Sequence, residues 1–529
     1  MATSSICCES LTHGTRGLEL AYLIVLGALL GGLIHARASP SKLLLSPLLA
    51  APLTVLAGWV QAVMSLLARS SGAGGESVLQ LALGATASAA IGYVAGRMLG
   101  LRRPLAGPLH RRGAIVSTDG IPRGGAGARI TLAGVPVAAE DETKHFKLIG
   151  TTGTGKSTAI HEMLGAALAR GDRAIIADPD GGYLARFHDA ARGDVILNPF
   201  NGDARKWDLL GEITNDYDVE QLARSLIPDG GDPDRVWSEY ARTFFIAVTQ
   251  QAIAGGTRSE AELYQLLTGA KADELREMLA GTAAGPFLEP GNEKMFGSLR
   301  SVASSAVRAL KYTLRQQATP FSVRQWVRDG AARCAGGPGG VLFLPYKAGE
   351  IAALGSMISA WMRIGIFEAM NGGEGDQRLW FVIDELDALG EIDGLKDALA
   401  RLRKFGGRCV LGFQSIAQVS GTYGRGTAET IIENCGNTLI LRCSASERGG
   451  TSEFASRLIG QREVVHTTRS TTRRFAEWRA STTESQHLRT EPAVLASEVE
   501  RLPDLAGFLK LASSPDWRAV RLTPLNSSA

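Results

Sequence analysis

The sequence has no regular spacing of cysteines. It contains six, of which Cys7 and Cys8 are adjacent and the other four are scattered without a CxxC pair. Zinc sites and disulfide frameworks use regular spacings, so this pattern favours neither of them. We therefore expect the large C-terminal part of the chain to occupy a reducing compartment.

The sequence also lacks a strong excess of either charge. Its formal net charge of +3 is small for 529 residues, so bulk charge neither indicates nor excludes nucleic-acid binding. A chain of this length is too long for one hydrophobic core, and at least two domains are expected. Apolar residues are concentrated in the first hundred positions, and the remainder has the composition of a soluble protein.

Three apolar stretches stand out at 20–36, 43–67 and 78–99. A membrane-spanning helix needs about 20 mostly apolar residues, which the second stretch meets comfortably and the first barely. The third is diluted by Gln80 and several glycines. We predict that all three cross a membrane, so that residues 1–112 form a multi-pass transmembrane region.

Basic residues after the third stretch predict the orientation of this region. By the positive-inside rule the segment that carries them is cytoplasmic, which places the N-terminus outside. These residues are Arg102, Arg103, Arg111 and Arg112. A cleaved signal peptide is the alternative, because Ala36-Arg37-Ala38 resembles a cleavage site, but cleavage there would leave the following domain outside.

A nucleotide-binding motif begins at Gly150, within KHFKLIGTTGTGKSTAI. The run Phe146–Ile149 is strand-like, and an amphipathic helix is predicted from Thr158 to Arg170. This is G-x-x-x-x-G-K-S between a strand and a helix, the context that a P-loop requires. The alternative is a glycine-rich turn that matches by chance, which the correct context disfavours.

The P-loop context predicts which groups contact a nucleotide. Glycines let backbone amides turn toward phosphates without a Cβ in the way, and the helix N-terminus adds its dipole. Lys156 is expected to reach the β- and γ-phosphates of ATP, and the Ser157 hydroxyl to bind Mg²⁺. The residues predicted to bind ATP are Gly150, Thr151, Thr152, Gly153, Thr154, Gly155, Lys156, Ser157 and Thr158.

A pair of acidic residues follows in LWFVIDELDAL. Leu379–Ile383 is a continuous apolar run, as expected for a central parallel strand, and it ends in Asp384 and Glu385. Asp384 is predicted to hold Mg²⁺ through water, and Glu385 to polarise the attacking water. The alternative is that both acids only cap the next helix.

Other strand-like runs alternate with helical segments, which predicts an α/β fold with a doubly wound parallel sheet. The runs are Arg173–Asp178, Val195–Pro199, Val341–Pro345, Arg408–Gln414 and Thr438–Cys443. Gln414 ends one of them, a position suited to sensing a γ-phosphate or simply to capping the strand. Residues 214–317 interrupt the alternation with amphipathic helices and predict an all-helical insertion in a motor domain of residues 113–213 and 318–529.

Two segments near the end of the motor domain are less clear from spacing. The helix Gly394–Gly407 carries Arg401 and Arg403, and a basic residue there could reach a neighbouring subunit's γ-phosphate, although spacing alone favours a solvated face. Residues 474–490 are polar and basic and are predicted to form a mobile loop. The runs GFLKLA and WRAVRLT then predict a terminal β-hairpin.

The ordered set of these segments resembles the TraD/TraG coupling proteins of conjugative type IV secretion. The segments are LAGVPV, GTTGTGKST, ADPDGGYLARF, DVILNPF, WDL, the helical insertion, LWFVIDELDALGEIDGLKDALARLRKFGGRCVLGFQS and EPAVL…LPDLAGFLKLA. The resemblance covers about residues 125–525. The P-loop alone is generic, whereas the order of the segments is specific.

The resemblance implies a RecA-like, ATP- and Mg²⁺-dependent motor that assembles as a hexamer at the bacterial inner membrane. It implies binding of DNA in a central channel with little sequence preference, and delivery of a relaxase–DNA complex to the secretion channel. By position in the family motifs, Arg403 rather than Arg401 matches the arginine finger, and Gln414 matches the strand-end glutamine. The implied catalytic residues are Lys156, Glu385, Arg403 and Gln414, with Ser157 and Asp384 as metal ligands.

The sequence departs from the family pattern in two places. Relatives commonly have two spanning helices around a periplasmic segment, whereas three apolar stretches occur here. Asp180 stands where many relatives carry Lys, so no phosphate contact is assigned to it.

Two other functions are alternatives. One is a cell-division-type chromosome DNA translocase, for which the segment after the predicted hairpin is too short to hold the winged-helix domain of that family. The other is a protein-secretion ATPase that does not bind DNA.

Overall fold

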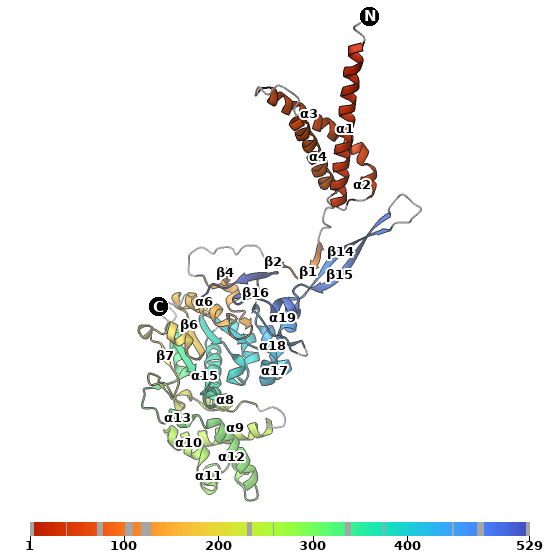
Figure 1. The fold of residues 1–529 in the computed structure, drawn as a ribbon. Coiled ribbons are helices and arrows are strands. Elements are labelled where there is room, and N and C mark those ends of the chain that lie inside the picture. Colours follow the sequence, from red (N-terminus) through yellow and green to blue (C-terminus); the bar gives the residue numbers. More distant parts are fainter. Residues whose placement is uncertain are drawn as a thin grey trace. The chain divides into compact units, whose positions relative to one another are not determined.

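The computed structural model describes residues 5–36, 38, 40–70, 78–100, 109–117, 129–229, 235–257, 259–333, 340–373, 375, 377–446, 449–472 and 481–524. The chain divides into two compact units, residues 1–109 with 467–485 and residues 110–466 with 486–529. Figure 1 shows the helices and strands of both units, coloured from the N-terminus to the C-terminus.

In the first unit, the three apolar stretches of the sequence lie within helices. These helices are α1 (Ser5–His35), α2 (Pro40–Leu44), α3 (Ser46–Ser70) and α4 (Val78–Gly100) (Figure 1). Helices α1 and α4 approach each other through glycines. A Cβ on Gly32 would lie 2.3 Å from the carbonyl oxygen of Tyr93, and one on Gly96 would lie 2.3 Å from that of Leu29. Close backbone approach through small residues is typical of helix packing in membranes.

Large apolar side chains lie on the outside of these helices. Leu23 is 62 % exposed, Trp59 71 % and Met98 70 %. Within the described residues, two helices are long and apolar enough to cross a membrane, Ser46–Val63 in α3 and α15 (Ile351–Asn371). Helix α15 is mostly buried in the second unit, and the apolar part of α1, Glu19–His35, is shorter. The three predicted spans are therefore not supported as a set.

The second unit is built on a ten-stranded sheet in the order β2-β17-β16-β13-β5-β12-β11-β6-β10-β7. In chain order its strands are β2 (Val116–Ser117), β5 (Phe146–Ile149), β6 (Arg173–Pro179), β7 (Val195–Ile196), β10 (Val341–Tyr346), β11 (Leu379–Ile383), β12 (Gly407–Phe413), β13 (Asn437–Ile440), β16 (Ala506–Lys510) and β17 (Trp517–Arg521). The neighbours from β13 to β7 are all parallel. Their carboxyl ends therefore share one edge, where such sheets bind ligands.

The sheet is mixed rather than wholly parallel as predicted. The predicted terminal hairpin is confirmed as β16 and β17, and it extends the sheet because β16 pairs antiparallel with β13. Two predicted strands are shorter than expected. The run from Val195 leaves the sheet after Ile196, where Asn198 turns the chain by accepting a 2.7 Å hydrogen bond from the backbone N–H of Phe200. Strand β13 ends at Ile440 instead of Cys443.

Helices cover both faces of the sheet. In β11, Leu379, Phe381 and Ile383 pack into one apolar cluster and Trp380 and Val382 into another, so both faces are buried. Outside the helical insertion, the helices of the second unit are α5 (Ala139–Glu142), α6 (Lys156–Ala169), α7 (Gly182–Phe187), α14 (Val323–Arg333), α15, α16 (Leu395–Leu402), α17 (Ile416–Tyr423), α18 (Arg425–Asn434), α19 (Gly450–Ile459) and α20 (Ala496–Glu500). This is the RecA-like arrangement that the resemblance implied.

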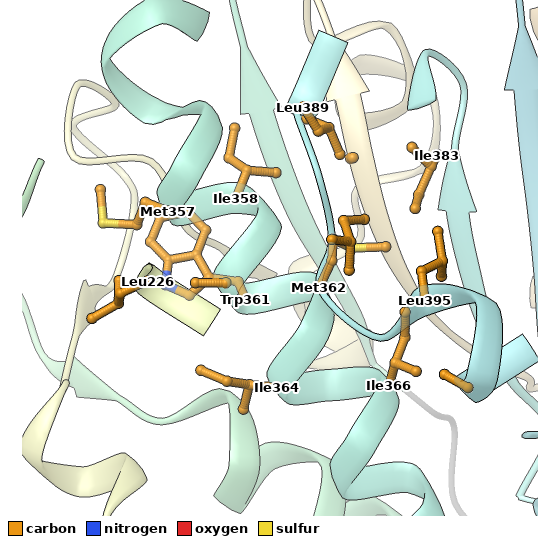
Figure 2. Packing of buried hydrophobic residues seen from close by; sticks show 14 of the residues in the cluster. Leu226, Met357, Ile358, Trp361, Met362, Ile364, Ile366, Ile383, Leu389 and Leu395 are labelled. Atoms are coloured by element: carbon orange, nitrogen blue, oxygen red, sulfur yellow. The ribbon is translucent and has the colours of Figure 1, made fainter. Parts of the chain in front are cut away.

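Helix α15 forms the centre of the larger cluster. Figure 2 shows its side chains Met357, Ile358, Trp361, Met362, Ile364 and Ile366 packed among Ile383 of β11, Leu389, Leu395 of α16 and Leu226. The apolar run of α15 is therefore explained by burial within the second unit. This packing fixes the strand that ends in the acidic pair.

The helical insertion lies between two short strands, β8 (Lys206–Trp207) and β9 (Pro320–Phe321), which pair in parallel. Its helices are α8 (Asp216–Leu226), α9 (Arg235–Ala254), α10 (Glu260–Thr268), α11 (Ala272–Met278), α12 (Glu293–Val307) and α13 (Leu310–Thr313). The last two of these helices are separated only by Arg308–Ala309. Both of these residues keep right-handed helical dihedral angles, so the helix direction continues.

A buried carboxylate joins the two ends of the insertion. Glu212 accepts hydrogen bonds from Trp207 Nε1 at 2.9 Å, from Val323 N at 2.7 Å and from Arg324 N at 3.0 Å. Burial raises its pKa, which these donors oppose. Glu212 thereby ties the strand that enters the insertion to the helix that follows it.

Two further small sheets lie outside the ten-stranded sheet. Strands β3 (Thr131–Leu132) and β4 (Val135–Pro136) form a hairpin, and β14 (Gln461–Thr472) and β15 (Ser481–Pro492) form a sheet with β1 (Leu109–Gly113). The predicted mobile loop at 474–490 is wrong from Ser481 onward. Backbone pairing forms β15 although most of its side chains between residues 484 and 492 are polar and exposed. Residues 473–480 lie outside the described residues.

Candidate nucleotide site

The loop between β5 and α6 has the backbone geometry that its glycines permit. Gly153 and Gly155 have φ angles of 76° and 116°, which lie in the region that side chains with a Cβ disfavour. Gly155 directly precedes α6, and the helix begins at Lys156. The N-terminus of α6 is thus directed into this loop at the carboxyl edge of the sheet, where its amides and dipole suit an anion.

The Lys156 side chain folds over this loop. Its Nζ donates hydrogen bonds to the carbonyl oxygens of Gly150 at 2.7 Å and Thr151 at 3.2 Å. Burial lowers the pKa of the Lys156 ammonium, while the nearby carboxylates of Asp384 and Glu385 oppose this shift. The lysine is therefore a buried cation beside the loop in which phosphates are expected.

Ser157 and Asp384 come together at the adjacent strand end. Ser157 Oγ donates a 2.6 Å hydrogen bond to Asp384 Oδ2, and Tyr183 Oη donates a second one of 2.8 Å to the same oxygen. Asp384 Oδ1 is buried and has no hydrogen-bond partner among the described residues. Hydroxyl and carboxylate oxygens are the ligands that Mg²⁺ prefers, so this cluster fits a magnesium ion.

Glu385 and Gln414 lie together at the ends of neighbouring strands β11 and β12. Gln414 Nε2 donates a hydrogen bond to Glu385 Oε1, and Gln414 Oε1 accepts one of 3.3 Å from Thr152 Oγ1. Burial raises the pKa of Glu385, as does the neighbouring carboxylate of Asp384. Gln414 therefore bridges the candidate catalytic carboxylate and the phosphate-binding loop.

The approach of β11 to β12 depends on a glycine. A Cβ on Gly412 would lie 1.9 Å from the carbonyl oxygen of Asp384, so no larger residue fits at this position without a backbone shift. Gly412 thus permits the close contact that places Asp384 beside the P-loop.

The C-terminal hairpin packs behind the P-loop. Leu505 N donates a 3.0 Å hydrogen bond to the Thr154 carbonyl, although Leu505 has a φ of 65°, which is unusual for a non-glycine residue. A Cβ on Gly155 would lie 2.8 Å from the Leu505 side chain. A segment more than three hundred residues away in the sequence therefore contacts the P-loop and holds it in place.

Arg403 stands apart from the other predicted site residues. It begins the turn before β12, is exposed, and lies near His145, whose pKa is lowered mainly by burial and further by the positive charge of Arg403. His145 directly precedes β5, whereas the P-loop follows β5, and β5 and β12 are parallel. Arg403 therefore lies at the opposite edge of the sheet from its own P-loop. The distance between them is the length of a seven-residue strand, about 20 Å.

The structure also shows site residues that the sequence reasoning missed. Asp178 at the end of β6 accepts hydrogen bonds from Tyr183 N at 3.0 Å and Leu184 N at 2.7 Å, which shapes the turn before α7. The Tyr183 ring stacks on the His161 ring of α6, with centroids 4.5 Å apart. The signal was present in ADPDGGYLARF, where a strand ends in Asp178, but nothing in the sequence alone connects Tyr183 to Asp384.

Comparisons with known proteins place this architecture in one family. A family model described as the type IV secretion-system coupling protein DNA-binding domain matches residues 129–523. The chain is 29 % identical over 406 residues to "Coupling protein TraD" of Escherichia coli (strain K12), covering 76 % of this chain and 55 % of that protein. It thus spans about half the length of that curated relative.

Solved structures of the coupling protein TrwB agree. A structure of TrwBΔN70 in its unbound form superposes with a TM-score of 0.67 at 32 % identity, over 76 % of this chain and 90 % of that one. TrwB in complex with ADP and Mg²⁺ gives a TM-score of 0.65 at 32 % identity, with the same coverage. From the ordered motifs, the shared fold and the family match, the chain belongs to the family of type IV secretion-system coupling proteins.

Proposed function

We propose that this protein is an ATP-hydrolysing coupling protein that binds DNA and moves a relaxase–DNA complex into a secretion channel. Family membership supports the role, and a site suited to nucleotide and metal supports the energy source. TrwB is described in complex with ADP and Mg²⁺ and with a non-hydrolysable ATP analogue, and we extend both ligands to this chain. The alternatives of a cell-division translocase and of a DNA-independent secretion ATPase are not favoured by the family match.

The observation that carries the proposal is the cluster around Asp384. Its buried Oδ1 lacks a hydrogen-bond partner in the described part of the chain, while Oδ2 already accepts from Ser157 and Tyr183. A bound Mg²⁺ would satisfy these oxygens and supply positive charge beside the phosphates. A buried, half-satisfied carboxylate beside a P-loop is costly unless such a ligand occupies the site.

We assign roles to the other site residues as follows. The Lys156 ammonium would exchange its contacts with the Gly150 and Thr151 carbonyls for contacts with the β- and γ-phosphates. Glu385, whose pKa is raised by burial, would orient the attacking water as a general base. Gln414 would sense whether a γ-phosphate is present, because it contacts both Glu385 and Thr152 of the P-loop.

We further propose that the protein works as a homo-hexameric ring. Arg403 lies at the sheet edge opposite its own P-loop, so it could serve as an arginine finger only at a neighbouring subunit's site. In this proposal residues 113–213 and 318–529 form the motor, and residues 214–317 form an inserted helical domain.

We also propose that residues 1–112 anchor the protein in the bacterial inner membrane with the motor in the cytoplasm. The exposed apolar side chains of α1, α3 and α4 and the glycine contacts between α1 and α4 support this location. Reporter fusions at residues 5, 40, 73 and 110 test how many of the three apolar stretches cross the membrane, since three spans would read outside, inside, outside and inside. A fusion at residue 5 that reads inside, with position 110 also inside, would restore a two-span arrangement.

The experiment that tests the function is ATP hydrolysis by the purified full chain with and without DNA. Single- and double-stranded DNA should stimulate turnover, and the Lys156→Ala protein should lose nearly all turnover with or without DNA. Hydrolysis that no DNA stimulates would favour the protein-secretion ATPase. No hydrolysis by the wild type, in detergent or in lipid, would remove the motor function.

A further inference from the structure

A long stretch of the helical insertion carries no acidic side chain. From Lys294 to Arg328 the sequence contains no Asp or Glu, although the whole chain is close to charge balance. Two of its arginines are used inside the fold, because Arg324 and Arg328 both form ion pairs with Glu368. The remaining basic residues of the stretch are Lys294, Arg300, Arg308, Lys311 and Arg315.

These five basic residues form no ion pair with any residue that the structure describes. Many other arginines of the second unit are paired, as Arg170 is with Glu142 and Arg192 with Asp194. Arg300 in addition has a buried Nε without a hydrogen-bond partner in the described chain, and burial lowers its pKa. The positive charge of this stretch is therefore not neutralised by ion pairs within the described part of the chain.

Helical spacing places most of this charge on one exposed face of α12 and α13. Phe296, Leu299, Ala303, Val307 and Leu310 pack inward. The opposite face carries exposed Lys294, Ser298, Ser301, Ser305, Arg308 and Arg315, and helical dihedral angles at Arg308 and Ala309 continue this face from α12 into α13. We call these six residues with Lys311 the α12–α13 basic face. Between Lys294 and Arg308 this face carries three exposed serine hydroxyls.

An aromatic pair, made of exposed Phe200 and half-buried Tyr312, lies at the α13 end of this face. Phe200, which follows β7, is 45 % exposed, and its ring meets the Tyr312 ring edge-on with centroids 4.8 Å apart. Lys311 Nζ lies 4.8 Å from the Tyr312 ring centroid. An exposed aromatic ring and a cation therefore lie side by side at this end of the α12–α13 basic face.

We propose that the α12–α13 basic face and the Phe200–Tyr312 pair form a contact surface for single-stranded DNA. The inference rests on the proposed function and adds the place and the type of strand. Arg308, Lys311 and Arg315 would contact phosphates, and an unpaired base would stack on the exposed aromatic ring. The aromatic pair favours single over double strands, because bases in a duplex already stack on one another. An acidic peptide would use the charges but not the rings.

The test measures binding of a fluorescent oligo-dT strand to the full chain in detergent micelles by fluorescence anisotropy. The test variant is the triple R308E/K311E/R315E. Removing three phosphate contacts should weaken binding on the order of 50-fold near 0.15 M salt, and should reduce the salt slope by about 2. The matched control is R224E/K271E/R521E, which reverses three exposed charges elsewhere and should bind nearly as the wild type does.

A second variant separates stacking from charge. Phe200→Ala should weaken binding of the single strand by about 5-fold or more and should affect a duplex of the same length much less. Tyr217→Ala removes another exposed aromatic ring and serves as its control. Circular dichroism and basal ATPase activity of every variant should match the wild type, since none of these residues belongs to the nucleotide site.

Three outcomes would overturn the inference. One is wild-type affinity and salt slope in R308E/K311E/R315E. Another is an equal loss of affinity for the single strand in the control variant R224E/K271E/R521E. The third is a variant that loses binding of poly-glutamate but keeps binding of DNA, which would assign the face to an acidic protein segment. Failure of the wild type to bind any DNA would instead count against the proposed function itself.

Discussion

Ser157 Oγ and Asp384 Oδ2 share a 2.6 Å hydrogen bond although the residues are 227 positions apart. Ser157 lies in the first turn of α6, after β5, and Asp384 follows β11, with β12 between the two strands. Parallel pairing brings both strand ends to one edge of the sheet, so the contact follows from the topology. The predictions below test what this edge does.

Lys156→Ala should lower ATP turnover by two orders of magnitude or more, about the loss expected when a preorganised group that stabilises phosphate charge is removed. DNA transfer by conjugation should be lost with it. Turnover is measured by phosphate release, and circular dichroism checks that the fold is kept. Lys271→Ala, which removes an exposed lysine of the insertion, is the control. Wild-type turnover in the Lys156→Ala protein would contradict the assignment of Lys156 to the nucleotide site.

Tyr183→Phe should raise the Mg²⁺ concentration needed for half-maximal turnover by roughly 10-fold, because groups that orient a metal ligand commonly contribute this much to metal affinity. The change removes only the hydroxyl that donates to Asp384 Oδ2 and keeps the ring that stacks on His161. The KM for ATP at saturating Mg²⁺ should change little. Tyr217→Phe is the control, and an unchanged Mg²⁺ dependence would show that Tyr183 only packs.

Arg403→Ala should abolish DNA-stimulated turnover while nucleotide binding by the isolated subunit persists. The reason is that Arg403 lies far from its own P-loop, and an arginine finger can supply about 10³–10⁵ in rate at a neighbour's site. Arg403→Lys should not restore activity, since an ammonium lacks the planar fork of the guanidinium. Arg401→Ala, two positions away and also exposed, is the matched control.

Mixing gives an independent check of the shared site. Arg403→Ala keeps an intact P-loop and Lys156→Ala keeps an intact finger, so mixed rings should contain some complete sites and regain partial turnover. If the Arg403→Ala protein alone hydrolyses ATP like the wild type at saturating DNA, the residue is a solvated side chain and the ring mechanism has no support from it.

Acidification should destabilise the second unit through His145. Its ring is buried, with Nε2 2.9 Å from the Leu399 carbonyl and Nδ1 accepting from Cys409 N at 3.1 Å, so both nitrogens are used by the neutral form. Burial lowers its pKa from 6.5 to about 4. Since the folded pKa lies below the unfolded one, the unfolded chain takes up the proton first, and stability falls as pH falls from 6.5 toward 4.

The expected loss from this residue is about 2 kcal/mol between pH 7 and pH 5. Urea unfolding followed by tryptophan fluorescence at the two pH values measures it. His145→Gln should have lower stability at pH 7 but a weaker dependence on pH, while His487→Gln, which changes an exposed histidine, should behave like the wild type. An identical pH dependence in His145→Gln and wild type would refute this account.

Local patterns in the sequence were sufficient to predict the P-loop motif, the strand that ends in two acidic residues and the parallel strands around them. Each is a contiguous motif whose residue types follow from the chemistry of a phosphate loop or a buried strand, as in Gly150–Ser157 and Leu379–Glu385. The helices of the insertion were also predicted, because their apolar residues repeat at helical spacing. Strand lengths and the 481–492 strand were not, since backbone pairing leaves little trace in polar side chains.

The sequence by itself determined which groups could bind a nucleotide and a metal, because those requirements are local. Only the tertiary structure decided that Tyr183 donates to Asp384, that Gly412 admits the Asp384 backbone, and that Leu505 holds the P-loop from behind. It likewise set Arg403 at the opposite sheet edge from the P-loop and brought Phe200 to Tyr312. These relationships join residues far apart in the chain, so they depend on strand order and packing, which no local pattern encodes.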